Sequence, residues 1–168
     1  MIYKDFQDLK LSALGLGAMR LPVVDGDDAR IDEAAAEKMV DYAIKRGINY
    51  FDTAWGYHSG RSELVMGKLL SRYPRDRFFL ADKFPGYDLS NMDRVEEIFE
   101  EQLKKCRVDR FDFYLFHNVC EMNIDAYLDE RHGIFDYLVR QKEAGRIRHL
   151  GFSAHGSYGV IERFLKAY

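Results

Sequence analysis

Four polar residues in this sequence have the types needed to protonate an oxygen atom as it becomes negative: Asp52, Tyr57, Lys83 and His117. Tyrosine, with a reference pKa of about 10, donates protons slowly near neutrality unless a nearby cation favours its phenolate. Lys83 could be that cation, and Asp52 the counter-ion that a buried lysine needs. A neutral His117 could donate a second hydrogen bond to the same oxygen.

Apolar, aromatic-rich stretches precede these residues, at positions 48–51, 78–81 and 111–116. Each stretch has the length and composition of a buried strand. In a parallel sheet wrapped by helices, active sites form where the carboxyl ends of the strands meet. The sequence therefore predicts that the four polar side chains serve one site at that end of a sheet.

Composition narrows the class of protein. The chain has 168 residues, of which 47% are hydrophobic, 32% charged and 14% aromatic, which predicts one soluble globular domain over residues 1–168. A net charge of −3 gives no electrostatic reason to bind nucleic acid or an anionic membrane. No apolar run approaches the roughly 20 residues that span a bilayer, and the N-terminus lacks the apolar core of a signal peptide, so we expect a cytoplasmic protein.

Cys106 and Cys120 are the only cysteines; Cys120 follows His117, and no close Cys or His pair lies beside either of them. Zinc and iron–sulfur sites usually need about four such ligands. We therefore expect two free thiols, with no metal and no iron–sulfur cluster in this chain. Asp25, Asp27 and Asp28 are read as a solvated loop, although three acids so close could hold a cation weakly.

Strand-like and helix-like segments alternate along the chain, which is typical of repeated βα units. Asp32 is a plausible helix cap, and Gly47 and Pro74 are helix stops. The predicted elements are a hairpin at 2–5 and 10–12, strands at 14–17, 48–51, 78–81, 111–116 and 147–152, and helices at 32–46, 62–73, 91–106, 133–143 and 157–168. The predicted fold is an α/β TIM-type (β/α)8 barrel, truncated to an N-terminal hairpin plus five βα units.

The segment from Gly47 to Gly67 resembles the aldo/keto reductase superfamily. It has a strand after a glycine, then Asp-Thr-Ala at 52–54, Tyr57, and a Glu-x-x-hydrophobic-Gly pattern from Glu63. Lys83 and His117 occur where that family places its other two catalytic residues, and residues 147–153 resemble its fifth strand. The Phe-Ser-Ala-His-Gly stretch at 152–156 is most similar to bacterial members that often carry a ferredoxin-like segment, which this chain lacks.

The resemblance implies reduction of an aldehyde or ketone by hydride transfer from NADPH, or the reverse oxidation. By resemblance to the family, Tyr57 is expected to be the general acid, and Lys83 and Asp52 are expected to adjust the acidity of its phenol. His117 is expected to position the substrate. Trp55, on a loop at the same rim, is a candidate for the substrate pocket, and so is Tyr87.

The resemblance also implies contacts with the nicotinamide. Ser153 matches a family position that hydrogen-bonds the carboxamide, but the asparagine that commonly follows is Ala154 here, and His155 is a candidate substitute. Met19 and Arg20 follow the first strand, where the family touches the nicotinamide end of the cofactor.

Each residue also has a non-catalytic interpretation. Taken singly, Tyr57 is a half-buried loop aromatic, Asp52 a turn or cap residue, Lys83 a solvated charge and His117 a hydrogen-bonded strand-end residue; only their joint placement favours catalysis. Ser153 could equally cap the helix that follows it. Trp55 could be a core residue, and for Met19, Arg20 and Tyr87 a purely structural role is favoured.

Length argues against an enzyme complete in this chain. A closed barrel takes about 250 residues, and its phosphate site commonly follows strands seven and eight. The resemblance places the aromatic that stacks on the nicotinamide, and the residues that hold the cofactor phosphates, in the three units that are missing. We therefore expect weak or no activity from these residues alone, and favour a piece of a longer product over a poorly stable remnant.

Two alternatives to a working enzyme follow from the same observations. One is a nicotinamide-binding regulatory or interaction module, and the other is a catalytically inactive fragment. Open sheet edges would also invite pairing with another chain, so self-association is expected if the product ends here.

Overall fold

A two-stranded hairpin is followed by five strands that alternate with helices along residues 1–168, all of which the computed structural model describes. The strands lie in the sheet in the order β3-β4-β5-β6-β7, which is also their order in the chain. The chain divides into two compact units, and each is described separately below. Unit 1 comprises Met1–Ala81 and Lys104–Val108, and unit 2 comprises Asp82–Leu103 and Asp109–Tyr168.

Unit 1 contains a hairpin, three parallel strands and two main helices. The parallel pairs match Gly17 with Asp52, and Asp52 in turn with Ala81. Its elements are β1 (Tyr3–Phe6), β2 (Leu9–Ser12), β3 (Leu16–Gly17), η1 (Ala18–Arg20), α1 (Glu33–Lys45), β4 (Tyr50–Asp52), α2 (Ser62–Leu70), η2 (Arg75–Arg77) and the first half of β5 (Phe79–Phe84).

The hairpin is attached to the segment that leads into β4. Asn49 accepts a hydrogen bond from the Ser12 amide at 2.8 Å, and the Ser12 hydroxyl accepts one from the Asn49 amide at 3.1 Å. The Tyr3 hydroxyl donates to the carbonyl of Gly47 at 2.9 Å. These contacts place the hairpin at the amino end of β4, opposite to the end that carries Asp52.

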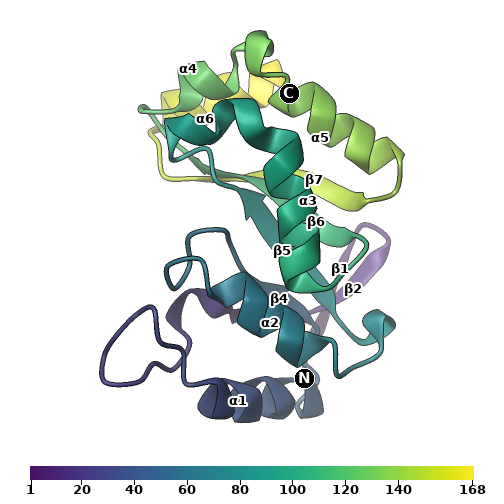
Figure 1. Cartoon of the computed structure of the whole chain (residues 1–168). Coiled ribbons are helices and arrows are strands. Elements are labelled where there is room, and N and C mark those ends of the chain that lie inside the picture. The colour runs from purple at the N-terminus through teal and green to yellow at the C-terminus, as the bar shows by residue number, and fades with distance from the viewer. The chain divides into compact units, whose positions relative to one another are not determined.

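Helix α1 begins and ends where its sequence predicts. The Asp32 side chain accepts a hydrogen bond from the Ala35 amide at 3.0 Å, which satisfies one of the unpaired donors at the helix start. Gly47 follows the helix with a φ of +88°, a conformation that side chains rarely adopt. Helices α1 and α2 lie side by side (Figure 1), and Lys68 of α2 pairs with Glu33 of α1 at 2.6 Å.

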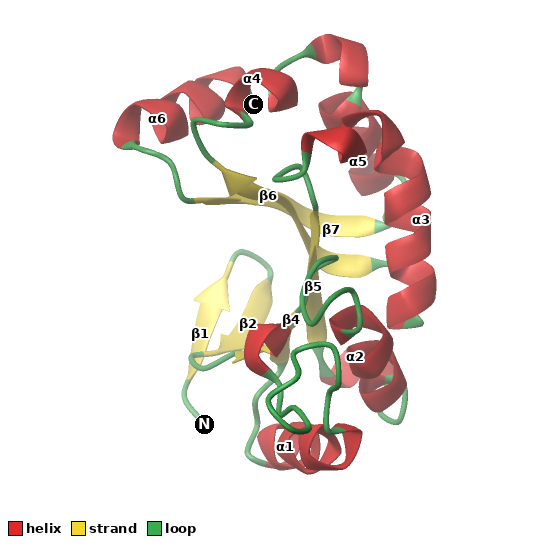
Figure 2. Cartoon of the chain, turned by 60° about the vertical axis from the view of Figure 1, so that its left-hand side comes forward, coloured by secondary structure: helices red, strands yellow, loops and turns green.

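Unit 2 contains the end of β5, two parallel strands and the helices that cover them. In Figure 2 α3 and α5 lie along one side of β6 and β7. Its elements are η3 (Leu89–Arg94), α3 (Val95–Cys106), whose last residues belong to unit 1, β6 (Phe111–Val119), α4 (Ile124–Tyr127), η4 (Glu130–His132), α5 (Ile134–Glu143), β7 (Ile147–Ala154) and α6 (Tyr158–Ala167).

Aromatic rings fill the space between these helices and strands. Phe99 of α3 meets Phe111 and Tyr114 of β6 edge-on, with centroid separations of 5.9 and 5.1 Å. On its other side it meets Tyr137 of α5 at 5.9 Å. Such T-shaped contacts add to the burial of apolar area, so one phenylalanine joins two helices to a strand.

Two strands are longer than predicted. The apolar stretches end at Ala81 and Phe116, yet β5 runs to Phe84 and β6 to Val119. Backbone pairing depends on the neighbouring strand and continues past the first polar residues. Lys83 and His117 consequently lie within strands, whereas they were predicted to follow them.

Helix boundaries also differ in places. The segment predicted as one helix over 91–106 has a 3-10 turn, η3, before α3, and α2 stops at Leu70 rather than at residue 73. Helix α4 was not predicted at all, because four residues are too few to show a helical period. No helix in the structure is both long and apolar enough to cross a membrane.

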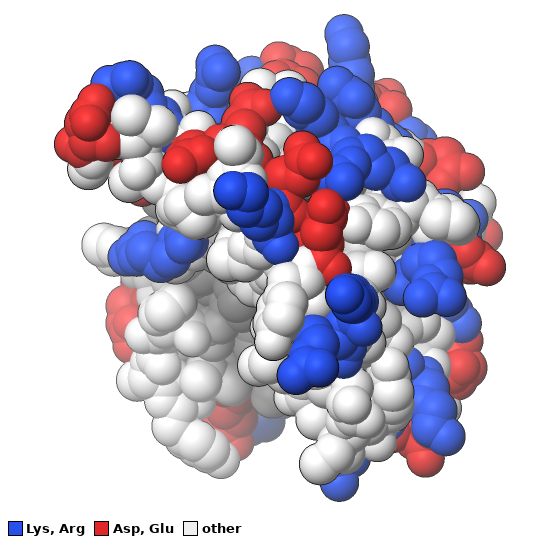
Figure 3. Space-filling view, turned by 90° about the horizontal axis from the view of Figure 1, so that it is seen from below, with Lys and Arg blue, Asp and Glu red and all other residues white.

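Charged side chains of both signs are interspersed on the face shown in Figure 3. Each unit also has surface ion pairs, among them Arg72 with Asp41 at 3.0 Å in unit 1 and Arg146 with Glu100 at 2.7 Å in unit 2. Exposed pairs of this kind add little stability, so the fold depends on its interior.

Gly67 of α2 offers a test of that interior. A Cβ there would overlap the backbone oxygen of Lys105 and lie 2.7 Å from the carbonyl carbon of Cys106. We expect Gly67→Ala to lower the free energy of unfolding by about 1–3 kcal/mol, although alanine is the better helix former. Gly159→Ala in α6 is the control, because nothing lies within 4 Å of that position. Urea denaturation would measure both, and an equal effect of the two substitutions would contradict the packing argument.

Candidate active site

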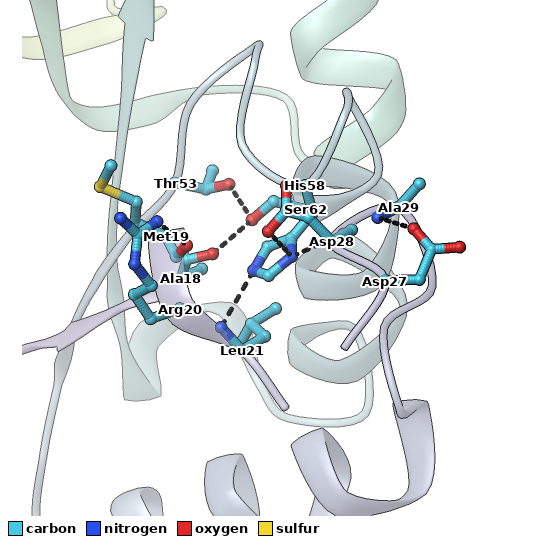
Figure 4. A network of polar contacts seen from close by, with 10 residues as sticks. All are labelled: Ala18, Met19, Arg20, Leu21, Asp27, Asp28, Ala29, Thr53, His58 and Ser62. Carbon is cyan, nitrogen blue, oxygen red and sulfur yellow. Dashed lines mark hydrogen bonds and ion pairs between the residues drawn. The ribbon is translucent and has the colours of Figure 1, made fainter. Parts of the chain in front are cut away.

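Unit 1 holds Asp52 at the last position of β4, and a buried chain of hydroxyl groups fixes the residue after it. Thr53 and Ser62 have their hydroxyl oxygens 2.9 Å apart, and Ser62 donates to the carbonyl of Ala18 at 3.1 Å (Figure 4). Because the Ser62 proton goes to Ala18, Thr53 must donate to Ser62. These two hydrogen bonds join the end of β4 to the start of α2 and to η1.

Tyr57 lies on the loop between β4 and α2, and its backbone is held on both sides. Its amide donates to Ala54 at 3.2 Å, and its carbonyl accepts from Gly60 at 3.1 Å and from Ser62 at 3.2 Å. His58, Ser59 and Gly60 then follow with φ values of +53°, +53° and +82°. Two consecutive non-glycine residues in the left-handed region need strong local contacts to stay there.

His58 supplies those contacts. Its side chain is buried, with 3% of the residue exposed, and its Nε2 accepts a hydrogen bond from the Leu21 amide at 3.0 Å. The ring therefore carries its proton on Nδ1, which donates to the carbonyl of Asp28 at 2.9 Å (Figure 4). A neutral imidazole thus ties the Tyr57 loop to two points on the loop between β3 and α1.

Trp55, the candidate substrate-binding residue of unit 1, is half-buried, and a cation lies over its ring. The ammonium of Lys105 lies 3.6 Å from the centroid of its ring, and the same ammonium is 3.3 Å from Glu63, which is fully buried. Glu63 and Gly67 of the family-like pattern therefore meet the same turn at the end of α3. Cation–π and ionic contacts together hold the indole in place.

Met19 and Arg20 form part of η1, directly after β3, and both are exposed. The Arg20 guanidinium donates to the carbonyl of Met19 at 3.2 Å. Asp25, predicted to be a solvated loop residue, is exposed and pairs with Arg30 at 3.3 Å.

Unit 2 holds Lys83 in β5, with only 5% of the residue exposed. Its backbone is hydrogen-bonded on both sides by buried side chains: Asp82 accepts from the Lys83 amide at 2.8 Å, and Gln102 of α3 donates to the Lys83 carbonyl at 3.0 Å. Gln102 also donates to Asp82 at 3.0 Å and accepts from the Tyr114 hydroxyl at 2.5 Å. The network fixes the position of the lysine along the strand.

His117 lies at an irregularity of β6. The register with β7 shifts between Phe116 and Val119, and Asn118 has a φ of +59°. Such bulges re-aim side chains next to functional sites. Burial, followed by the charges of Lys83 and His155, lowers the pKa of His117 from 6.5 to about 4, so the ring is neutral at pH 7.

Tyr87, the candidate substrate residue of unit 2, lies against that ring. The Tyr87 and His117 rings meet at right angles with centroids 5.1 Å apart, and Tyr87 is partly exposed. The structure thus brings this pair together with Lys83 inside one unit.

Ser153 lies in β7 and not at a helix start, so its interpretation as a cap for the last helix is wrong. Helix α6 begins at Tyr158 with Ser157 at the cap position. The strand continues past its apolar residues, and the Ser153 hydroxyl accepts a hydrogen bond from the Asn118 amide at 2.9 Å. His155, the candidate substitute for a missing asparagine, is exposed just beyond the strand.

Sequence reasoning missed the residues that hold the candidate residues of each unit in place. These are His58 in unit 1, and Asp82, Gln102 and Tyr114 in unit 2. Gln102 is fully buried although it lies in a charged helix, and His58 directly follows Tyr57. A polar residue on the apolar face of α3 was the available signal for Gln102. Nothing in the sequence reveals the distant partners of His58.

Substituting His58 tests the loop anchor. We expect His58→Ala to lower the free energy of unfolding by about 2–4 kcal/mol, because the Leu21 amide would lose its partner in a buried place. His132→Ala is the control, since that ring pairs at the surface with Asp93 and should cost less than about 1 kcal/mol. Chemical denaturation compares them, and a loss for His58→Ala no greater than the control would refute the anchor.

The titration of His117 is a second test. Because its folded pKa is about 4 and its ordinary value is 6.5, the unfolded chain takes up the proton first as the pH falls. The stability that the neutral ring contributes is complete above about pH 6.5 and is lost progressively down to about pH 4. NMR of the ring C–H signal, assigned with His117→Gln, should give a midpoint near 4; a midpoint near 6.5 would contradict the burial of this ring.

Comparison with known proteins places this chain in a family. The model of the Aldo/keto reductase family matches residues 13–167. L-galactose dehydrogenase from Arabidopsis thaliana is 32% identical over 151 residues, which cover 86% of this chain and 45% of that protein. The chain therefore spans less than half the length of this curated relative.

Solved structures agree on the fold. The aldo-keto reductase AKR11C1 from Bacillus halodurans, in its holo form, is 28% identical, with a TM-score of 0.75 over 95% of this chain and 51% of that one. An aldo-keto reductase from Klebsiella pneumoniae, solved in complex with NADPH, shares the fold at 20% identity, with a TM-score of 0.71 over 99% of this chain and 54% of that one. The predicted fold class, a truncated TIM-type barrel, is confirmed, and the chain belongs to the aldo/keto reductase family of oxidoreductases.

Proposed function

We propose that this chain carries the proton-donating half of an NADPH-dependent carbonyl reductase. Unit 1 contributes Asp52 and Tyr57, and unit 2 contributes Lys83 and His117. The observation that carries the proposal is the burial of Lys83, whose backbone is held by Asp82 and Gln102. Burying an ammonium is costly, so a lysine held in a buried place is a candidate for a functional role.

The chemistry assigned to each residue follows from its type. NADPH, when bound, supplies a hydride to the carbonyl carbon of an aldehyde or ketone. The electron pair of the carbonyl double bond passes to oxygen, and Tyr57 donates its phenol proton to that oxygen to give the alcohol. Lys83 stabilises the phenolate that remains, Asp52 balances the charge of Lys83, and the neutral His117 donates a hydrogen bond that orients the carbonyl.

Ser153 fits a nicotinamide carboxamide. Its oxygen already accepts the Asn118 amide hydrogen, so its own proton remains for a carbonyl oxygen of the ligand. We propose Met19 and Arg20 as further contacts at the nicotinamide end, and Trp55 and Tyr87 as walls of the substrate pocket. The exposure of Met19 and Arg20 leaves both accessible to a ligand.

We further propose that the 168 residues bind NADPH weakly by themselves and act within a longer product or an association of chains. The chain spans about half of its solved relatives, and β7 is the last strand in the sheet order. Beside β7 an open apolar groove of about 620 Å³ is lined by rings that include Phe116, Phe135, Phe152 and Phe164. Uncovered apolar surface of this kind favours pairing with another segment or chain.

The test uses the natural gene product that contains these residues, with NADPH and a generic aldehyde. We expect steady consumption of NADPH, and a loss of at least about 100-fold in kcat for Tyr57→Phe with little change in cofactor affinity. Tyr42→Phe, at an exposed position of α1, is the control and should leave kcat unchanged.

Two outcomes would overturn the proposal. If Tyr57→Phe and the parent protein reduced the aldehyde at the same rate, Tyr57 would not be the acid. If the parent bound NADPH but reduced none of a panel of aldehydes and ketones, a nicotinamide-binding module would replace the enzyme.

A further inference from the structure

One buried hydroxyl in unit 2 bonds to the two backbone segments that carry Lys83 and His117. It belongs to Tyr127, the last residue of α4, which is 1% exposed. The hydroxyl oxygen lies 2.9 Å from the carbonyl oxygen of His117, 3.3 Å from that of Phe84 and 3.1 Å from the amide of Gly86. Phe84 directly follows Lys83 in β5.

The hydrogen-bonding capacity of a phenol matches these partners. Tyr127 has one proton, which it donates to His117 at the shorter distance and shares with Phe84, and its oxygen accepts from Gly86. The Gly86 amide is itself shared with the Phe84 carbonyl at 2.9 Å. Burial raises the pKa of Tyr127, so the proton stays on the oxygen throughout the physiological range.

The ring that carries this hydroxyl has little freedom to move. It meets Phe84 and Phe116 edge-on, with centroids 6.3 and 5.4 Å away, and Phe164 of α6 at 6.2 Å. On the remaining side it lies against Gly86, where a Cβ would overlap the hydroxyl and lie 2.5 Å from the ring carbon Cε1. Only glycine lets the backbone approach the phenol so closely.

We infer that Tyr127 is a positioning residue for the proposed reaction, because its hydroxyl holds the end of β5 and the bulge of β6 at a fixed separation and so sets Lys83 relative to His117. This inference rests on the catalytic roles proposed above for those two residues. The hydroxyl is not a catalytic group, since it contacts only backbone atoms of the protein.

The network around Lys83 fixes the lysine, and Tyr127 contacts the backbone that carries His117. Asp82 and Gln102 fix the lysine along β5, and Tyr114 of β6 reaches that network through its own hydroxyl from the helix-covered side. The bulge between Phe116 and Val119 leaves that backbone outside the regular register, where a side-chain hydrogen bond replaces regular pairing.

The experiment compares Tyr127→Phe with the parent chain by NMR. The substitution keeps the ring and removes only the hydroxyl, so the His117 carbonyl and the Gly86 amide lose a buried partner. We expect the midpoint of the His117 titration to rise from about 4 toward 6.5, because a displaced ring is better hydrated and farther from the charges of Lys83 and His155. A merely destabilised protein that keeps its folded geometry would leave this midpoint unchanged.

Tyr137→Phe is the matched control. Tyr137 is also a buried tyrosine of unit 2, and its hydroxyl makes one long contact of 3.5 Å with Glu100. The inference predicts that this variant leaves the His117 midpoint where it is. A folded Tyr127→Phe variant with an unchanged midpoint would overturn the inference, as would an equal shift in both variants.

If Tyr127→Phe does not fold, the parent chain still provides a test. With tyrosine labelled at Cζ, a hydroxyl that exchanges slowly gives two resolved signals in mixed H2O and D2O. The inference predicts two signals for Tyr127, and a single averaged signal would contradict it. None of these measurements follows reduction, so the two proposals can fail separately. A protein that reduces no carbonyl but shows the predicted shift of the His117 midpoint in Tyr127→Phe would refute the proposed function alone. An active enzyme whose His117 midpoint is unchanged in Tyr127→Phe would refute this inference alone.

Discussion

The constraint on which the rest of the structure depends is the burial of charged groups in β5 and in the first turn of α2. Glu63, Asp82 and Lys83 are all buried, and a buried charge destabilises a fold unless other groups pair with it. Glu63 is paired with Lys105, and Asp82 receives hydrogen bonds from Gln102 and the Lys83 backbone. Of these partners, Lys105 and Gln102 both come from α3, Lys105 from the part of that helix that belongs to unit 1 and Gln102 from the part that belongs to unit 2.

A second regularity is that hydrogen bonds from side chains fix the backbone next to the residues proposed for catalysis. The loop that carries Tyr57 is fixed by His58, the Lys83 peptide by Asp82 and Gln102, and the His117 carbonyl by Tyr127. Reactive side chains must lie within a fraction of an ångström of their working positions, and packing alone specifies backbone less closely than directed hydrogen bonds. The residues proposed for catalysis thus differ from the residues that position them.

Much of this architecture could be predicted from the sequence. The strand-like stretches, the Asp32 cap and the residues that resemble the aldo/keto reductases lie close together in the chain, where local pattern is informative. The carboxyl ends of β5 and β6 were misplaced because pairing with neighbours extended them past Lys83 and His117.

The positioning residues could not be predicted in this way. His58 and Leu21 are separated by 37 positions and Tyr127 and Gly86 by 41, and no local period marks such pairs. Ser153 shows the same limit, because a serine ahead of a helix resembles a cap until the strand is seen to include it.

These residues are proposed to protonate a carbonyl oxygen while its carbon receives a hydride. The most direct measurement follows that hydride: the natural gene product is given an aldehyde and NADPH carrying deuterium at one or the other position of C4. The account predicts that one of the two labelled cofactors delivers its deuterium to the carbinol carbon of the alcohol, while the other delivers none. Alcohol without deuterium from either cofactor, or no alcohol at all, would contradict it.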